Sequence, residues 1–203
     1  VCRLFASMGI RFIRLTGGEP LIRYQITDLI QQIKAVDGIE KVTLTTNGVL
    51  LADMADALIE SGIDGINVSL DSMDREQFQV ITRYDMLSRV LQGIDLMSEK
   101  EIPIKINCVT ICQGKGHERA EDEERLIKVA ELAKDRAIDV RMIELMPIGY
   151  GVNYQFIEED RIRQLLQERY GMLQPFEEIC GNGPGTYYTI DGFVGRIGFI
   201  SAI

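Results

Sequence analysis

The sequence lacks the features that mark membrane and secreted proteins. No apolar run approaches the roughly 20 residues that a membrane-spanning helix needs. The start, Val-Cys-Arg-Leu-Phe, has neither the basic residues nor the apolar stretch of a secretory signal. It also lacks an initiator methionine, so we interpret it as a cut edge. We therefore expect a cytoplasmic protein without a membrane partner.

Basic residues are also scarce. The 203 residues contain 22 Lys and Arg against 31 Asp and Glu, which gives a net charge of −9. Binding to a nucleic-acid backbone needs a basic face, so we expect no nucleic-acid partner. A small phosphorylated ligand stays compatible with this charge, because a few cations in a pocket act within a screening length of about 10 Å.

Histidine and cysteine, the usual ligands of transition metals, are few. The one histidine, His117, is predicted to be a loop residue. The irregular spacing of Cys2, Cys108, Cys112 and Cys180 does not indicate a disulfide framework. Cys108 and Cys112 form a C-x-x-x-C pair, but the pair lies in a strand-like alternation and no third ligand follows nearby. Buried strand cysteines are the favoured interpretation, and we expect no metal site in this chain.

What the sequence does contain is a repeated alternation of strand and helix signals. This order predicts an α/β fold with a parallel sheet. The predicted strands cover residues 11–16, 41–47, 65–71, 102–110 and 137–146, and the predicted helices residues 26–36, 52–61, 74–83, 87–100 and 122–137.

The alternation changes after Gly149. A further helix is predicted at 158–170, followed by two β runs at 187–190 and 193–200 around an Asp191-Gly192 turn, which is a hairpin signature. We therefore expect a β/α barrel domain over residues 1–150 and a C-terminal extension over residues 151–203.

The predicted strands carry polar residues at every second position. Successive strand residues point to opposite faces, and the face that packs on helices should be apolar. Unpaired polar groups in a dry barrel interior would each cost on the order of 1–3 kcal/mol. We therefore expect a wide or incomplete barrel with a wet, ligand-filled interior. The polar positions are Arg14 and Thr16, Thr43, Thr45 and Asn47, Asn67, Ser69 and Asp71, and Lys105 and Asn107.

Glycines and a carboxylate follow the first predicted strand. Gly17 and Gly18 would let the backbone approach a ligand closely, and Glu19 could hold an ammonium group. A tight turn with a solvent-facing Glu19 is the structural alternative. Two further polar segments, 45–48 and 67–71, also end predicted strands, where barrel enzymes place their sites.

Six segments, at 13–21, 45–48, 67–72, 105–107, 141–149 and 181–201, carry a family resemblance. The chain resembles the radical S-adenosylmethionine (SAM) superfamily through Gly17-Gly-Glu-Pro. It is similar within it to the GTP 3′,8-cyclase family of molybdenum cofactor biosynthesis through Arg141-Met-Ile-Glu-Leu-Met-Pro-Ile-Gly and the Gly-x-Gly-Pro run at 181–184.

This resemblance implies a partial TIM-type β/α barrel that works with SAM and two 4Fe–4S clusters. A 5′-deoxyadenosyl radical from SAM would abstract hydrogen from the GTP ribose, and the ribose radical would attack the guanine ring. The lyase product, (8S)-3′,8-cyclo-7,8-dihydroguanosine 5′-triphosphate, would pass to downstream enzymes of the pathway. A homodimer is compatible with this picture.

The resemblance also implies two sets of binding residues. GTP would contact Arg14, Thr45 and Lys105, which share the inward parity, and the two cations suit a triphosphate. The implied SAM contacts are Gly17, Gly18, Glu19, Ser69, Arg141 and Met146. Arg141 and Met146 differ in parity, so both can touch SAM only if a strand end or bulge lies between them. Arg141 paired with an acid and Met146 as core filler are the structural alternatives.

The chain departs from the family pattern at both ends. The C-x-x-x-C-x-x-C loop and the C-terminal cysteines of the family are absent, which implies a fragment without its cluster ligands. Phe12 stands where a second cation is expected, Ala202 replaces a proline, and the 114–124 loop is longer. We therefore predict that this chain alone is inactive.

Two other functions remain open from sequence. One is a different radical SAM enzyme with an auxiliary cluster, such as a peptide-modifying one. The other is a paralogue without clusters that only binds a nucleotide.

Overall fold

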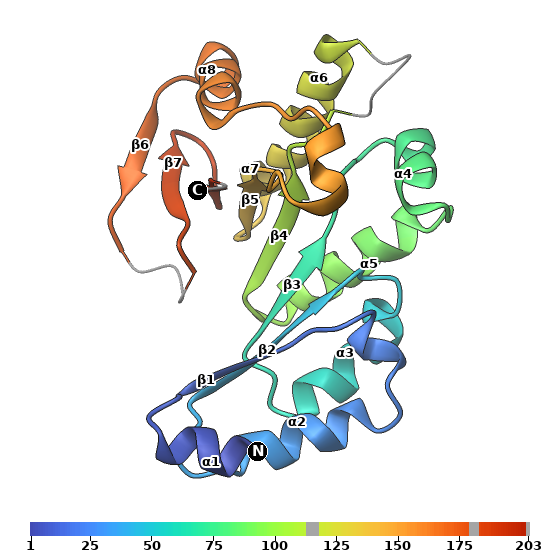
Figure 1. The fold of residues 1–203 in the computed structure, drawn as a ribbon, viewed down its shortest axis with the longest axis vertical. Coiled ribbons are helices and arrows are strands. Elements are labelled where there is room, and N and C mark those ends of the chain that lie inside the picture. Colours follow the sequence, from blue (N-terminus) through green and yellow to red (C-terminus); the bar gives the residue numbers. More distant parts are fainter. Residues whose placement is uncertain (113–117, 179–182, 202–203) are drawn as a thin grey trace. The chain divides into compact units, whose positions relative to one another are not determined.

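The computed structural model describes residues 1–112, 118–178 and 183–201. The fold is α/β with a sheet that is not closed, which confirms the predicted partial barrel (Figure 1). The chain divides into two compact units, Val1–Ser69 with Met86–Lys105, and Leu70–Asp85 with Ile106–Ile203. No helix among the described residues is both long enough and apolar enough to cross a membrane.

The first unit is a parallel β/α arrangement. Its strands are β1 (Phe12–Leu15), β2 (Lys41–Thr46) and β3 (Gly65–Ser69), paired in that order. Next to β3, the Pro103 carbonyl at the start of β4 (Ile104–Val109) accepts a hydrogen bond from the Ile66 N–H. The helices are α1 (Cys2–Ser7), α2 (Ile26–Lys34), α3 (Leu51–Glu60) and α5 (Leu87–Glu99), with a 3-10 turn η1 (Pro20–Ile22).

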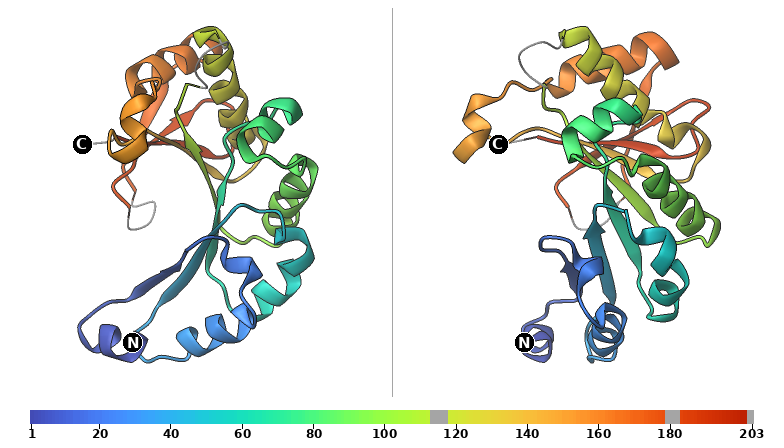
Figure 2. Two further views of the ribbon diagram at one scale, coloured as in Figure 1. Left: turned by 45° about the vertical axis from the view of Figure 1, so that its right-hand side comes forward. Right: turned by 90° about the vertical axis from the view of Figure 1, so that its right-hand side faces the viewer.

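The core of the first unit lies between these strands and helices α2, α3 and α5, which lie on one side of the strands (Figures 1 and 2). The strand residues that face the core alternate with the polar positions, as the sequence predicts. Burial of these aliphatic side chains, at about 25 cal/mol per Å², is the main stabilising term. Fully buried members of this core are Val42, Leu44, Val68, Leu51, Leu58, Ile30, Val90 and Ile94.

The second unit contains the rest of β4 and a mixed sheet. The strands β5 (Asp139–Ile143), β8 (Arg196–Ile200), β7 (Thr186–Ile190) and β6 (Leu173–Phe176) follow in that spatial order, with β5 and β8 parallel and the remaining pairs antiparallel. The helices are α4 (Arg75–Thr82), α6 (Arg119–Ala130), α7 (Leu132–Asp135) and α8 (Glu159–Tyr170), with a 3-10 turn η2 (Gly149–Asn153). The predicted hairpin around Asp191-Gly192 is confirmed as β7 and β8.

Several predicted bounds differ from the structure. The helix predicted at 122–137 begins earlier, at Arg119, and is divided into α6 and α7. The strand β6 has no counterpart in the prediction, because its Pro175 is atypical of strands. It is an edge strand, one of the few places in a sheet that tolerate proline. The division into domains at 150 and 151 stays a prediction.

Candidate functional site

The loop after β1 leaves open space beside its two glycines. A Cβ atom placed on Gly17 or Gly18 would meet no atom within 4 Å among the described residues. Gly17 also has φ +150°, a conformation that side-chain-bearing residues rarely adopt. A ligand can therefore approach the backbone here, so the loop fits the SAM contact that the sequence predicts.

Glu19 fastens this loop to the carboxyl end of β2. Its Oε1 accepts hydrogen bonds from the Leu21 N–H at 3.0 Å and from the Thr46 hydroxyl at 2.7 Å, and its Oε2 accepts one from the Asn47 N–H at 2.7 Å. A carboxylate has about four lone-pair sites, so one site is left for a ligand. Glu19 is therefore not the solvent-facing residue of a simple turn, because it joins two strand ends.

Sequence reasoning missed the partners of Glu19. Thr46 has the parity of Leu44 and is buried with it, so the alternation placed it on the helix-facing side. No signal in the sequence pairs its hydroxyl with a carboxylate 27 residues away.

The predicted GTP residues lie on the polar face of the first unit. Arg14 pairs in register with Thr43, and Thr45 follows two residues further along the same face of β2. Arg14 is exposed and makes no hydrogen bond or ion pair with any residue that the structure describes. Lys105 is half-buried on β4, and its neighbours Ile104 and Ile106 are buried. Phe12 lies on the same side of β1 as Arg14 and is 43% exposed, so an apolar ring stands where a second cation was expected.

Two polar residues of β3 have different environments. Ser69 ends the strand and is exposed. Asn67 is buried, and its side chain donates a hydrogen bond to the Leu44 carbonyl at 3.2 Å. Ser69 is therefore available to a ligand, whereas Asn67 joins β3 to β2.

The other two predicted SAM residues belong to the second unit. Arg141 lies in β5 with 5% exposure, and its register partner is Gly198 of β8. Met146 lies three residues beyond the end of β5 and is 61% exposed, which argues against a role as core filler. The end of β5 lies between Arg141 and Met146. Such a strand end is the condition under which two residues of different parity could both touch SAM.

The cysteines of the described residues do not fit an iron–sulfur cluster. Cys108 is fully buried in β4, which confirms its interpretation as a core residue, and burial raises the pKa of its thiol strongly. Burial also raises the pKa of Cys112, although a nearby cation opposes this. Clusters need thiolates, and no three His, Cys, Asp or Glu side chains gather as a metal site in the parts of the chain described. His117 and Cys180 lie outside the described residues.

Seven of the predicted site residues thus belong to the first unit. Six of them lie at or near the carboxyl ends of β1, β2 and β3, whereas Lys105 lies near the amino end of β4. Residues 1–117 match the model of the radical SAM superfamily. This chain belongs to the radical SAM superfamily. The superfamily match covers all of the first unit, including the Gly17–Glu19 loop.

Curated relatives of this chain carry a more specific name than that of the superfamily. A GTP 3′,8-cyclase of Clostridium perfringens strain 13 is 40% identical over 200 residues, which cover 98% of this chain and 59% of the relative. A GTP 3′,8-cyclase of Desulforamulus reducens is also 40% identical, over 203 residues, covering 98% of this chain and 60% of the relative. The chain therefore spans about 60% of the length of these relatives.

Solved structures support the fold. The chain is similar to a domain of pyruvate-formate lyase-activating enzyme from Bacteroides vulgatus, with a TM-score of 0.57, 19% identity, and coverage of 75% of this chain and 90% of that domain. It is also similar to native anSMEcpe with bound AdoMet and the Cp18Cys peptide, with a TM-score of 0.60, 16% identity, and coverage of 83% and 49%. At these identities the likeness concerns the fold alone.

Proposed function

We propose that this chain forms the barrel of a GTP 3′,8-cyclase, which converts GTP to (8S)-3′,8-cyclo-7,8-dihydroguanosine 5′-triphosphate in the first step of molybdenum cofactor biosynthesis. The observation that carries the proposal is the polar face of the first unit. There the exposed cation Arg14 and the half-buried Thr45 lie on neighbouring strands, and the open Gly17–Glu19 loop follows the strand that carries Arg14. The 40% identity to relatives of that name supports the same substrate.

In this proposal the chain's own residues bind and orient the two small molecules. Arg14 and Lys105 would neutralise the triphosphate, and Thr45 would donate a hydrogen bond to GTP. The SAM contacts would come from the remaining predicted residues, Gly17, Gly18, Glu19, Ser69, Arg141 and Met146. SAM would supply the radical chemistry, and the thiolates for both 4Fe–4S clusters would have to come from outside the described residues.

The test uses the complete protein that contains this chain, reconstituted without oxygen with iron and sulfide. We expect 5′-deoxyadenosine and the cyclised nucleotide to form together when GTP and SAM are both present. A cysteine-containing peptide in place of GTP serves as the control for a peptide-modifying enzyme. Radical formation with the peptide and none with GTP would overturn the proposal.

The same assay tests the isolated chain of residues 1–203. We expect no 5′-deoxyadenosine from it after identical reconstitution. SAM cleavage by this chain would show that it holds a working cluster, contrary to the donor set of its described residues.

A further inference from the structure

A fully buried arginine stands out in the second unit. Arg125 lies in α6, and its side chain has no exposed surface. Its Nε lies 3.5 Å from an Oδ1 of Asp122, one helical turn earlier and 3% exposed. A buried cation is costly unless it is paired and hydrogen-bonded, so its retention points to a specific set of contacts.

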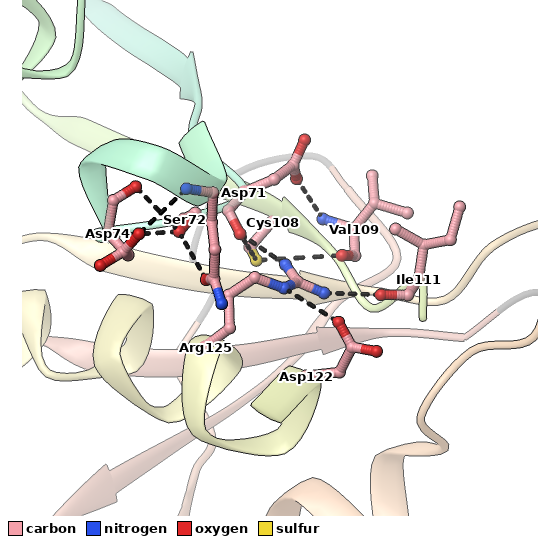
Figure 3. A network of polar contacts seen from close by, with 9 residues as sticks. Asp71, Ser72, Asp74, Cys108, Val109, Ile111, Asp122 and Arg125 are labelled. Atoms are coloured by element: carbon pink, nitrogen blue, oxygen red, sulfur yellow. Dashed lines mark hydrogen bonds and ion pairs between the residues drawn. The ribbon is translucent and has the colours of Figure 1, made fainter. Parts of the chain in front are cut away.

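The guanidinium of Arg125 binds two backbone carbonyls from different segments. Its Nη1 donates to the Asp71 carbonyl at 2.5 Å, and its Nη2 donates to the Ile111 carbonyl at 2.6 Å (Figure 3). Asp71 is two residues after the last residue of β3, and Ile111 is two residues after the last residue of β4. One side chain therefore holds the segments that follow two strands.

The segment after β3 is held at further points. The Asp71 carboxylate accepts a hydrogen bond from the Val109 N–H at 2.8 Å. The Ser72 hydroxyl accepts one from the Asp74 N–H at 3.0 Å, and the Asp74 side chain caps α4 by accepting one from the Gln77 N–H at 2.9 Å (Figure 3). Among the described residues of this network, Arg125 is the one side chain that donates hydrogen bonds from a helix both to the segment after β3 and to the segment after β4.

These segments continue the carboxyl ends of parallel strands, where β/α-barrel enzymes place their ligands. Ser69, a proposed SAM contact, is separated from Asp71 by Leu70 alone. Fixing the Asp71 carbonyl therefore restricts the backbone that follows Ser69. Of the proposed GTP contacts, Arg14 and Thr45 lie within β1 and β2, and Lys105 lies near the amino end of β4, six residues before Ile111. The hydrogen bonds of Arg125 go to Asp71 and Ile111 and to none of these three residues.

We propose that Arg125 is a positioning residue for SAM binding, acting through the backbone at Asp71 and Ile111 rather than through contact with the ligand. This inference rests on the proposed function. It predicts a selective effect: loss of the guanidinium should weaken the binding of SAM and leave the binding of GTP intact. A purely structural role would lower thermal stability without that selectivity.

The test measures the Kd of SAM and of GTP by equilibrium dialysis on the complete, reconstituted protein and its variants. We expect Arg125→Met to weaken SAM binding by about tenfold, because the backbone after Ser69 is no longer held in place before SAM binds, and to change GTP binding less than twofold. Arg125→Lys keeps the charge but cannot bridge both carbonyls, so it should weaken SAM binding by an intermediate factor.

The matched control is Arg161→Met. Arg161 of α8 forms a two-point ion pair, at 2.9 and 2.8 Å, with Glu123 of α6, the helix that carries Arg125, and these bonds involve neither the segment after β3 nor the segment after β4. We expect Arg161→Met to lower the melting temperature of the protein and to leave its affinities for SAM and GTP unchanged. If Arg125→Met is too unstable to purify, the Kd values of SAM and GTP are measured on Arg125→Lys instead.

Unchanged affinities in the folded Arg125 variants, or equal losses for SAM and GTP, would overturn the positioning role. Failure of the unmodified protein to bind SAM would instead overturn the proposed function, and this inference with it. The two failures are therefore distinguishable by the unmodified protein alone.

Discussion

Polar residues are largely accessible on a strand of the first unit and buried on a strand of the second unit. In β2 of the first unit, Val42 and Leu44 are buried while Lys41, Thr43 and Thr45 are not. In β5 of the second unit, Asp139, Val140, Arg141 and Met142 are all buried. A strand with one uncovered face presents its polar side chains to solvent, whereas a polar side chain on a strand covered on both faces is enclosed by the fold.

This difference in burial determines which partners a polar side chain has in each unit. The buried Asp139 accepts a hydrogen bond from the Nε of Arg196 at 2.7 Å. The buried Arg125 is likewise bound, whereas Arg14 on the uncovered face has no partner among the described residues. Asp139 and Arg125, which are each paired inside the second unit, should therefore matter first for stability, whereas Arg14 should matter for ligand binding. Four substitutions test this comparison.

The largest effect on stability is expected at Arg125. Arg125→Met removes the hydrogen bonds to two part-buried carbonyls and the cation beside the buried Asp122, so the free energy of unfolding should fall by about 3 kcal/mol. Denaturant unfolding of the chain measures it. A loss below about 0.5 kcal/mol, typical of surface substitutions, would contradict the contrast between the units.

A smaller loss is expected at Gly198. A Cβ atom there would lie 2.8 Å from Cε1 of Tyr187 and 3.2 Å from Cγ of Arg141, so Gly198→Ala overpacks the sheet and should cost about 2 kcal/mol. The matched control in the first unit is Gly18→Ala, where a Cβ meets open space. Equal losses of unfolding free energy for the two variants would show that the first-unit loop is packed rather than open.

Arg14→Ala should affect the ligand instead of the fold. We expect a loss of about 1.5 kcal/mol in GTP binding, roughly tenfold in Kd, and a change in unfolding free energy within about 0.5 kcal/mol. Lys41→Ala removes a cation from the same face at the amino end of β2 and is the control. Equal weakening of GTP binding by both variants would point to general electrostatics instead of a phosphate contact.

The smallest effect is a pH-dependent one at the α6–α8 ion pair. The hydrogen bond from Arg161 is the main cause that lowers the pKa of Glu123. A lowered carboxyl pKa stabilises the fold above the unfolded-state value, and this stability disappears as the pH falls through the folded-state value. Arg161→Met should therefore lower the free energy of unfolding more at pH 7 than at pH 3. A cost that does not change over this pH range would mean that packing of the Arg161 stem, and not the charge of Glu123, makes the contribution.

Sequence alone determined the strand-and-helix order and the polar face. Alternation is a local property, since every second strand residue points the same way, so Thr43 and Thr45 could be assigned to a face before any contact was known. The Gly17-Gly18-Glu19 loop and the hairpin turn at Asp191-Gly192 were likewise predicted from local turn chemistry. The edge strand β6 was missed, because propensity disfavours Pro175 and only its place at the sheet edge permits it.

The tertiary structure decided which polar residues are buried and with what. Arg125 lies in a helix of mostly charged residues and was not singled out from the sequence, because its burial depends on carbonyls 54 and 14 residues away. Glu19 gains partners from Thr46 and Asn47 in the same way. Periodicity specifies the direction of a side chain, but a hydrogen-bond partner brought from a distant segment is specified only when the chain has folded.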